Sequence, residues 1–187
     1  MAYGILFLRV VVGLLFFAHG AQKLFGWFGG HGPHGTAGFF HRLGFRREHA
    51  LLLALAAGAS EAAGLLLALG LLTPFAALAT ASVMVVAVGT VHRRNGLWST
   101  EGGYEYNLVL WAVAIALAAS GPGRFSLDAA LGWAGNITGL WWGVGVMVAS
   151  LGGGAVVMAL REPQLPAEDT DAALTREREH ETQTIVS

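Results

Sequence analysis

Four polar side chains interrupt an apolar stretch near the start of the chain, residues 9–28, and their spacing suggests chemistry. They are Arg9, His19, Gln22 and Lys23. One helical stripe at intervals of three or four residues comprises Arg9, Gly13, Phe16, Gly20 and Lys23. Ionisable groups within a membrane segment are costly, and they often mark a functional site. The alternative is a packing stripe that ends in a lysine whose ammonium reaches the membrane surface.

The composition indicates an integral membrane protein. Of the 187 residues, 55% are hydrophobic and only 12% are charged, with a mean hydropathy of +0.58. A soluble domain carries about 25% charged residues. The chain has no cysteine, which excludes disulfides, thiolate metal sites, iron–sulfur clusters and dithiol redox centres formed by its own side chains.

Five apolar segments predict an all-α membrane protein, a four-helix transmembrane bundle plus a fifth C-terminal transmembrane helix. A span needs about 20 apolar residues to cross a hydrocarbon core of about 30 Å. The predicted spanning helices cover residues 4–24, 50–72, 74–91, 104–120 and 138–160. The first is predicted to be retained and not a signal peptide, because no basic region precedes it and Ala18-His19-Gly20 is a poor cleavage site.

The domain organisation follows from these segments. Residues 1–137 are predicted to form the four-helix unit, with a glycine-rich loop at 25–48. Residues 138–160 add the fifth helix, and residues 161–187 form a charged, largely disordered cytoplasmic tail.

Basic residues predict the orientation in the inner (plasma) membrane. One side would hold Lys23, Arg42, Arg46, Arg47, Arg93, Arg94, Arg161, Arg176 and Arg178, whereas the other side has only Arg124. Because basic loops stay in the cytoplasm, the N-terminus should face outward and the tail should be cytoplasmic.

Polar side chains of three predicted helices are expected at one depth near the cytoplasmic side. Together they predict a polar pocket. Its candidate ligand-binding residues are Gln22, Glu105, Tyr106 and Asn107, and the candidate catalytic residues are His19, Lys23, Glu61 and His92.

Glu61 is expected near the middle of the bilayer, where a lone ionised carboxylate would be very costly. Arg9 is the basic residue predicted at comparable depth, so an Arg9–Glu61 ion pair is predicted. Such a pair would be a structural clamp that sets the helix register, or a carboxylate that binds a ligand or carries a proton.

Metal binding is not predicted. His31, His34 and His41 lie in a loop where glycine and proline separate the first two, and only Glu48 could add a ligand. A haem held by His19 and His92 is a less favoured alternative. Phosphate-binding, dinucleotide-binding and nucleophile-elbow motifs are absent, and no nucleic-acid partner is expected.

Several motifs in the right order resemble the DoxX family over about residues 5–130. They are LRVVVGLLFFAHGAQKLFGWFGG, GTAGFF, LGF, SEAAGLLLALGLLTPFAAL, VGTVHRRNGLW, GGYEYNLVL and GPGRFSLD. The resemblance implies a small four-helix membrane unit similar to the small subunits of thiosulfate:quinone oxidoreductase and to partners of complexes that handle thiols and oxidative stress. The positions that match the family's polar motifs are Arg9, His19, Gln22, Lys23, Glu61, His92, Glu105, Tyr106 and Asn107.

Two functions compete at this stage. The first is a membrane subunit of a quinone-linked oxidoreductase, with His19 or His92 bonded to a quinone carbonyl, Lys23 stabilising negative charge, and Glu61 or Glu105 relaying protons. The second is a non-enzymatic anchor or scaffold for a cytoplasmic oxidoreductase partner. Solute transport ranks lowest, because no inverted repeat is visible. A homo-oligomer is an open alternative.

Overall fold

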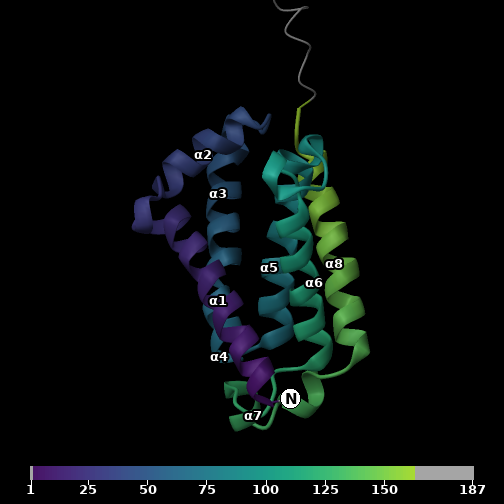
Figure 1. The fold of residues 1–187 in the computed structure, drawn as a ribbon. Helices are drawn as coiled ribbons and strands as arrows, with labels where there is room; N and C mark the ends of the chain where they lie inside the picture. Colours follow the sequence, from purple (N-terminus) through teal and green to yellow (C-terminus); the bar gives the residue numbers. More distant parts are fainter. Residues whose placement is uncertain (1, 163–187) are drawn as a thin grey trace, which may run out of the picture.

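The computed structural model describes residues 2–162, and this part of the chain is helical, with no strand (Figure 1). The long helices are α1 (Ala2–Phe25), α3 (Arg47–Ala62) with its continuation α4 (Gly64–Leu69), α5 (Thr73–Ala87), α6 (Glu105–Ser120) and α8 (Leu140–Ala159). Shorter helices are α2 (Gly32–Arg42) and α7 (Leu127–Ala130). Single turns occupy Trp27–Gly29, Val88–His92, Arg93–Asn95, Ser99–Glu101 and Ala134–Ile137.

The helices form two groups that diverge toward one end (Figure 1). In the first group α1 packs against α3 and α4, and α2 packs against α3. In the second group α5 packs against α6 and α8. The two groups come together at the end where α7 lies, which we call the α7 end, and separate toward the opposite end, the α2 end (Figure 1).

Small residues bring α1 close to α3 and α4 and set their register. A side chain added at Gly13 would overlap Gly64 and Ala68, and one added at Gly20 would overlap Gly58 and Ala62. Without side chains at these points the backbones approach closely, as membrane helices do. Gly13 therefore lies level with the start of α4, and Gly20 lies level with the second half of α3.

Buried Asp128 ties the α7 end of the fold to the start of α5. Its carboxylate accepts hydrogen bonds from the backbone N–H groups of Leu72 (2.8 Å) and Thr73 (3.0 Å) and from the Thr73 hydroxyl (2.7 Å). Pro74 follows in the first turn of α5, where a missing N–H costs nothing. The carboxylate thus satisfies free N–H groups at a helix start.

Four helical segments have the length and apolarity to cross a membrane. They are Ala2–Phe25, Arg47–Leu69, Thr73–Asn95 and Leu140–Ala159. The predicted all-helical membrane fold is therefore confirmed for the described residues. The predicted total of five spanning helices is not supported, because α6 has only 16 residues.

The segment predicted as a glycine-rich loop, residues 25–48, contains helix α2. Pro33 lies at its start, and Phe40 packs with Phe45, Ala50 and Ala54 of the next segment. The end of α8 is bound to the same place, because Arg161 Nε donates to the Leu43 carbonyl (2.9 Å). The predicted tail, apart from Arg161 and Glu162, lies outside the described residues.

Gly20→Ala should destabilise the fold, although alanine normally favours a helix over glycine. The new methyl group would overlap the backbone of Gly58 and Ala62, so we expect a loss of about 1–3 kcal/mol. Thermal unfolding in detergent measures it. The control is Gly145→Ala in α8, where a side chain meets no atom within 4 Å. Equal effects of the two substitutions would contradict the close α1–α3 contact.

Candidate functional site

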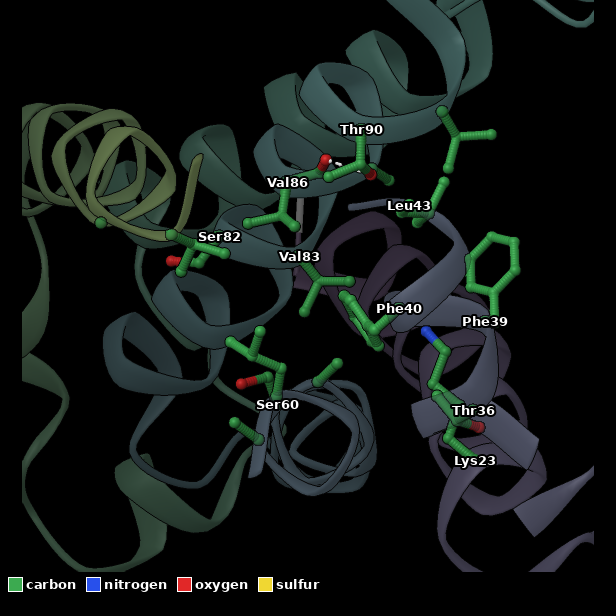
Figure 2. Close-up of a pocket in the computed structure, with 17 residues that line it drawn as sticks. Lys23, Thr36, Phe39, Phe40, Leu43, Ser60, Ser82, Val83, Val86 and Thr90 are labelled. Carbon is green, nitrogen blue, oxygen red and sulfur yellow. Dashed lines mark hydrogen bonds between the residues drawn. The ribbon is translucent and has the colours of Figure 1, made fainter. Parts of the chain in front are cut away.

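A cavity of about 260 Å³ lies where the two helix groups diverge. Figure 2 shows Phe39 and Phe40 of α2 on one side and Val83 and Val86 of α5 on the other. Its lining is Lys23, Thr36, Phe39, Phe40, Leu43, Leu53, Ala56, Ala57, Ser60, Ser82, Val83, Val86, Ala87, Thr90, Val91, Gly153 and Val157. The wall is thus mainly apolar, which suits a lipophilic ligand.

The few polar groups of the large cavity differ in what they offer a ligand. The hydroxyls of Thr36, Ser82 and Thr90 each donate to a carbonyl of their own helix at 2.8 Å, which leaves their oxygens as acceptors. Lys23 and Ser60 add groups that can donate hydrogen bonds, and Lys23 is the cation on this wall.

Lys23 forms an ion pair with Glu61. The Lys23 ammonium donates to Oε1 of Glu61, whose side chain is only 4% exposed, whereas the Lys23 side chain is 28% exposed. The second carboxylate oxygen, Oε2, is buried without a hydrogen-bond partner among residues 2–162. A buried carboxylate is costly unless it is paired, so the ion pair with Lys23 offsets the cost of burying the Glu61 carboxylate in this bundle.

The predicted Arg9–Glu61 pair is wrong. Buried Arg9 donates instead to the backbone carbonyls of Pro122 and Phe125, the latter at 2.6 Å. The register of α1 explains the error, because Arg9 lies against Gly70 at the α7 end, while Glu61 lies level with the last turns of α1. The sequence predicts Glu61 near the middle of the bilayer and Arg9 only several residues from the outer end of its helix, at comparable depth, because each depth is counted along its own helix.

The structure does not gather the other predicted residues into one pocket. Gln22 donates to the Phe28 carbonyl (3.1 Å), His92 Nδ1 contacts the Gly102 carbonyl (2.7 Å), and Asn107 donates to Met84 sulfur (3.5 Å). None of these three lines the large cavity. Side chains at the same depth on different helices therefore need not lie close together, because the rotation of each helix about its axis decides which way its side chains point.

Glu105 is also engaged locally. Its carboxylate accepts from the backbone N–H and the hydroxyl of Ser99, at 3.1 and 2.9 Å, within the loop that precedes α6. His19 and Tyr106, by contrast, lie with Glu61 around a second, smaller cavity. Four of the predicted site residues thus lie together, namely Lys23, Glu61, His19 and Tyr106. Glu105 instead stabilises the loop before α6.

Histidines of the first loop do not converge with acidic side chains. Among residues 2–162, no three or more histidine and acidic side chains lie close enough to hold a metal ion. His41 Nδ1 contacts the Phe45 carbonyl at 3.1 Å, beside the cluster that packs α2 on α3.

Sequence reasoning missed most of the large cavity. Its hydroxyl residues Ser60, Ser82 and Thr90 were a usable signal, because they lie within otherwise apolar helices. The contributions of α2 and α8 carried no such signal, since Phe39, Gly153 and Val157 are typical of any membrane helix.

Comparison with known proteins matches the chain to a family model. The family model described as DoxX matches residues 4–93, a range that covers α1 from Gly4 onward and α2 to α5. No curated protein and no solved structure matches the chain. The matched range contains Lys23, Glu61 and most of the large-cavity lining.

A double-mutant cycle should identify the partner of Glu61. Lys23→Met and Glu61→Gln should each destabilise the fold, and their coupling energy should be about 1–3 kcal/mol because the side chains touch. The Arg9→Gln and Glu61→Gln pair is the control, with effects that add to within about 0.5 kcal/mol. Reversible unfolding in mixed micelles gives both values. Strong coupling of Glu61 to Arg9 and none to Lys23 would refute the observed pairing.

Proposed function

The chain belongs to the DoxX family of membrane proteins, and from this premise we propose that it is the membrane subunit of a quinone-linked oxidoreductase. The family is linked to quinone oxidoreductase functions. One observation carries the proposal, namely an apolar cavity of about 260 Å³ with a single cation, Lys23, on its wall.

The residues present fit a quinone head group. Aromatic and aliphatic side chains such as Phe39, Phe40 and Val83 suit the ring, and Lys23 and Ser60 can donate to a carbonyl oxygen. The hydroxyls of Thr36, Ser82 and Thr90 donate their hydrogens to backbone carbonyls, so their oxygens can accept hydrogen bonds from the hydroxyl groups of the quinol.

Lys23 and Glu61 are the proposed reactive pair. Reduction of a quinone to a quinol takes two electrons and two protons and passes negative charge to the carbonyl oxygens. A fixed ammonium stabilises that charge, and Glu61 holds the ammonium in place. The electrons come from a partner oxidoreductase in this proposal, and thiol or sulfur compounds are the proposed reductants of that partner.

An anchor for a soluble oxidoreductase is the second candidate, and the exposed loops favour it. Arg42, Arg46, Arg47, Arg93 and Arg94 are exposed on the loops and helix ends near the α2 end. These cations would attract an acidic protein surface. The two functions are compatible, because a docked partner would stand next to the large cavity.

We also propose that α6 is a fifth crossing and that the α2 end faces the cytoplasm. Sixteen helical residues extend about 24 Å, and α6 runs beside α5 and α8 for its whole length (Figure 1). The start of α1 and the end of α8 lie at opposite ends of the bundle, which agrees with an odd number of crossings (Figure 1). Basic residues at the α2 end favour the cytoplasmic side of the plasma membrane.

The topology is tested with reporters fused after Ser187. A green fluorescent protein should fluoresce there, and an alkaline phosphatase should stay inactive, because the tail is cytoplasmic. Reporters fused before Ala2 should behave in the opposite way. An active phosphatase at the tail would contradict the proposed orientation, and the same response at both termini would contradict five crossings.

Quinone binding is tested by filling the cavity. Gly153 lines the cavity and neighbouring Gly152 does not, and a Cβ atom added at either meets no atom within 4 Å. Gly153→Leu should therefore weaken labelling by a photoreactive quinone about tenfold, the equivalent of ~1.4 kcal/mol. Gly152→Leu is the matched control and should label as the unmodified protein does. Equal labelling of both variants would refute this cavity as the quinone site.

A further inference from the structure

A second cavity lies on the other side of the Lys23–Glu61 pair. Its volume is about 30 Å³. It is lined by Leu15, Phe16, His19, Glu61, Met84, Tyr106 and Leu110. Glu61 lines this small cavity and not the large one, whereas Lys23 lines the large cavity and not the small one. The ion pair thus separates two cavities, with the cation toward one and the carboxylate toward the other.

The carboxylate of Glu61 is only half satisfied. Oε1 accepts from Lys23, but Oε2 is buried without a partner among residues 2–162, and the residue as a whole is 3% exposed. An unsatisfied buried acceptor is costly, and more so when it is charged. The small cavity exceeds the roughly 10–15 Å³ that one water molecule occupies. A single water therefore fits in the small cavity that Glu61 lines.

Two further polar groups reach the same cavity from α1 and α6. His19 Nδ1 lies 3.0 Å from the Leu15 carbonyl, and because a carbonyl only accepts, Nδ1 carries the hydrogen. The other ring nitrogen, Nε2, is then free to take up and release a proton. Tyr106 is half-exposed and adds a phenol, which both donates and accepts.

We propose that the small cavity is a proton-entry site that holds one water molecule, bonded to Oε2 of Glu61 and linked to His19 and Tyr106. The transfer moves one proton and no electron. Nε2 of His19 first takes a proton from the aqueous phase, that N–H bond then breaks as the water takes the proton, and another proton of the same water passes to Oε2. Lys23 gives its own proton to a ligand in the large cavity and is restored by Glu61.

This inference rests on the proposed function only for the destination of the proton, a quinone oxygen in the large cavity. The water and the protonation of Glu61 are independent of it. The titratable groups that face Glu61 across the pair and the small cavity are Lys23 and His19 from α1 and Tyr106 from α6, while α5 contributes uncharged Met84.

Infrared difference spectroscopy of the full chain in lipid nanodiscs tests the site without any quinone. A change of pH should produce a carboxylic acid C=O band that shifts in heavy water and is missing in Glu61→Gln. Tyr106→Phe should shift the band, because the hydroxyl linked to the water is gone. Tyr104→Phe is the matched control and should leave the band in place, since Tyr104 lines a different groove.

The outcomes separate this inference from the proposed function. A band that is the same in the unmodified protein and in Glu61→Gln would overturn the proton site. If Glu61→Gln does not fold, the Tyr106→Phe spectrum decides, because this substitution keeps the aromatic ring of half-exposed Tyr106 and removes only its hydroxyl. An unshifted band in Tyr106→Phe would overturn the water link. Failure of quinone photolabelling with the band intact would refute only the quinone proposal.

Discussion

Burial of a carboxylate in an apolar bundle requires a cation, and the Lys23–Glu61 pair meets this requirement at the junction of α1 and α3. Taking either partner away would leave a buried charge without compensation, so the pair constrains both helices. The close approach at Gly20 and Gly58 makes the contact geometrically available. The small residues and the ion pair therefore depend on each other, since a larger side chain at either glycine would separate the two charged groups.

A different set of polar contacts holds the α7 end. Arg9 binds the carbonyls of Pro122 and Phe125, and Asp128 binds the N–H groups of Leu72 and Thr73. The Arg9 contacts connect the first helix group to the segment after α6, and the Asp128 contacts connect α7 to the start of α5. At the α2 end the connection runs through the residues that follow α8: Arg161 donates to the Leu43 carbonyl, and the Glu162 N–H donates to the Gly44 carbonyl. The large cavity lies where the groups diverge.

The ion pair lies between two cavities, and in the proposed chemistry protons pass from the small cavity through the pair to the ligand in the large cavity. A lipophilic ligand would occupy the large cavity on the Lys23 side, and a water would occupy the small cavity, where His19, Glu61 and Tyr106 contribute polar groups. The lining of the large cavity is mainly apolar, and the small cavity is the proposed source of protons. In the mainly apolar surroundings of the large cavity, the Lys23 ammonium acts on a ligand oxygen more strongly than it would in water.

The sequence alone determined the class of the protein and the identity of its costly residues. Apolar segments of spanning length, few charges and the motif order were enough to predict a helical membrane protein of the DoxX family, because a hydrocarbon core imposes length and polarity on each segment separately. The same rule marked Arg9, Lys23 and Glu61 as residues that need partners.

Only the tertiary structure decided which partners these residues take. Arg9 and Lys23 lie on one stripe of α1, and the register of α1 on α3 and α4 brings Lys23, not Arg9, to Glu61. Register and rotation depend on how glycines and alanines of different helices fit together, and local sequence does not encode that fit. The same holds for Asp128 and for the cavity wall supplied by α2 and α8, since their importance arises from contacts between segments far apart in the chain.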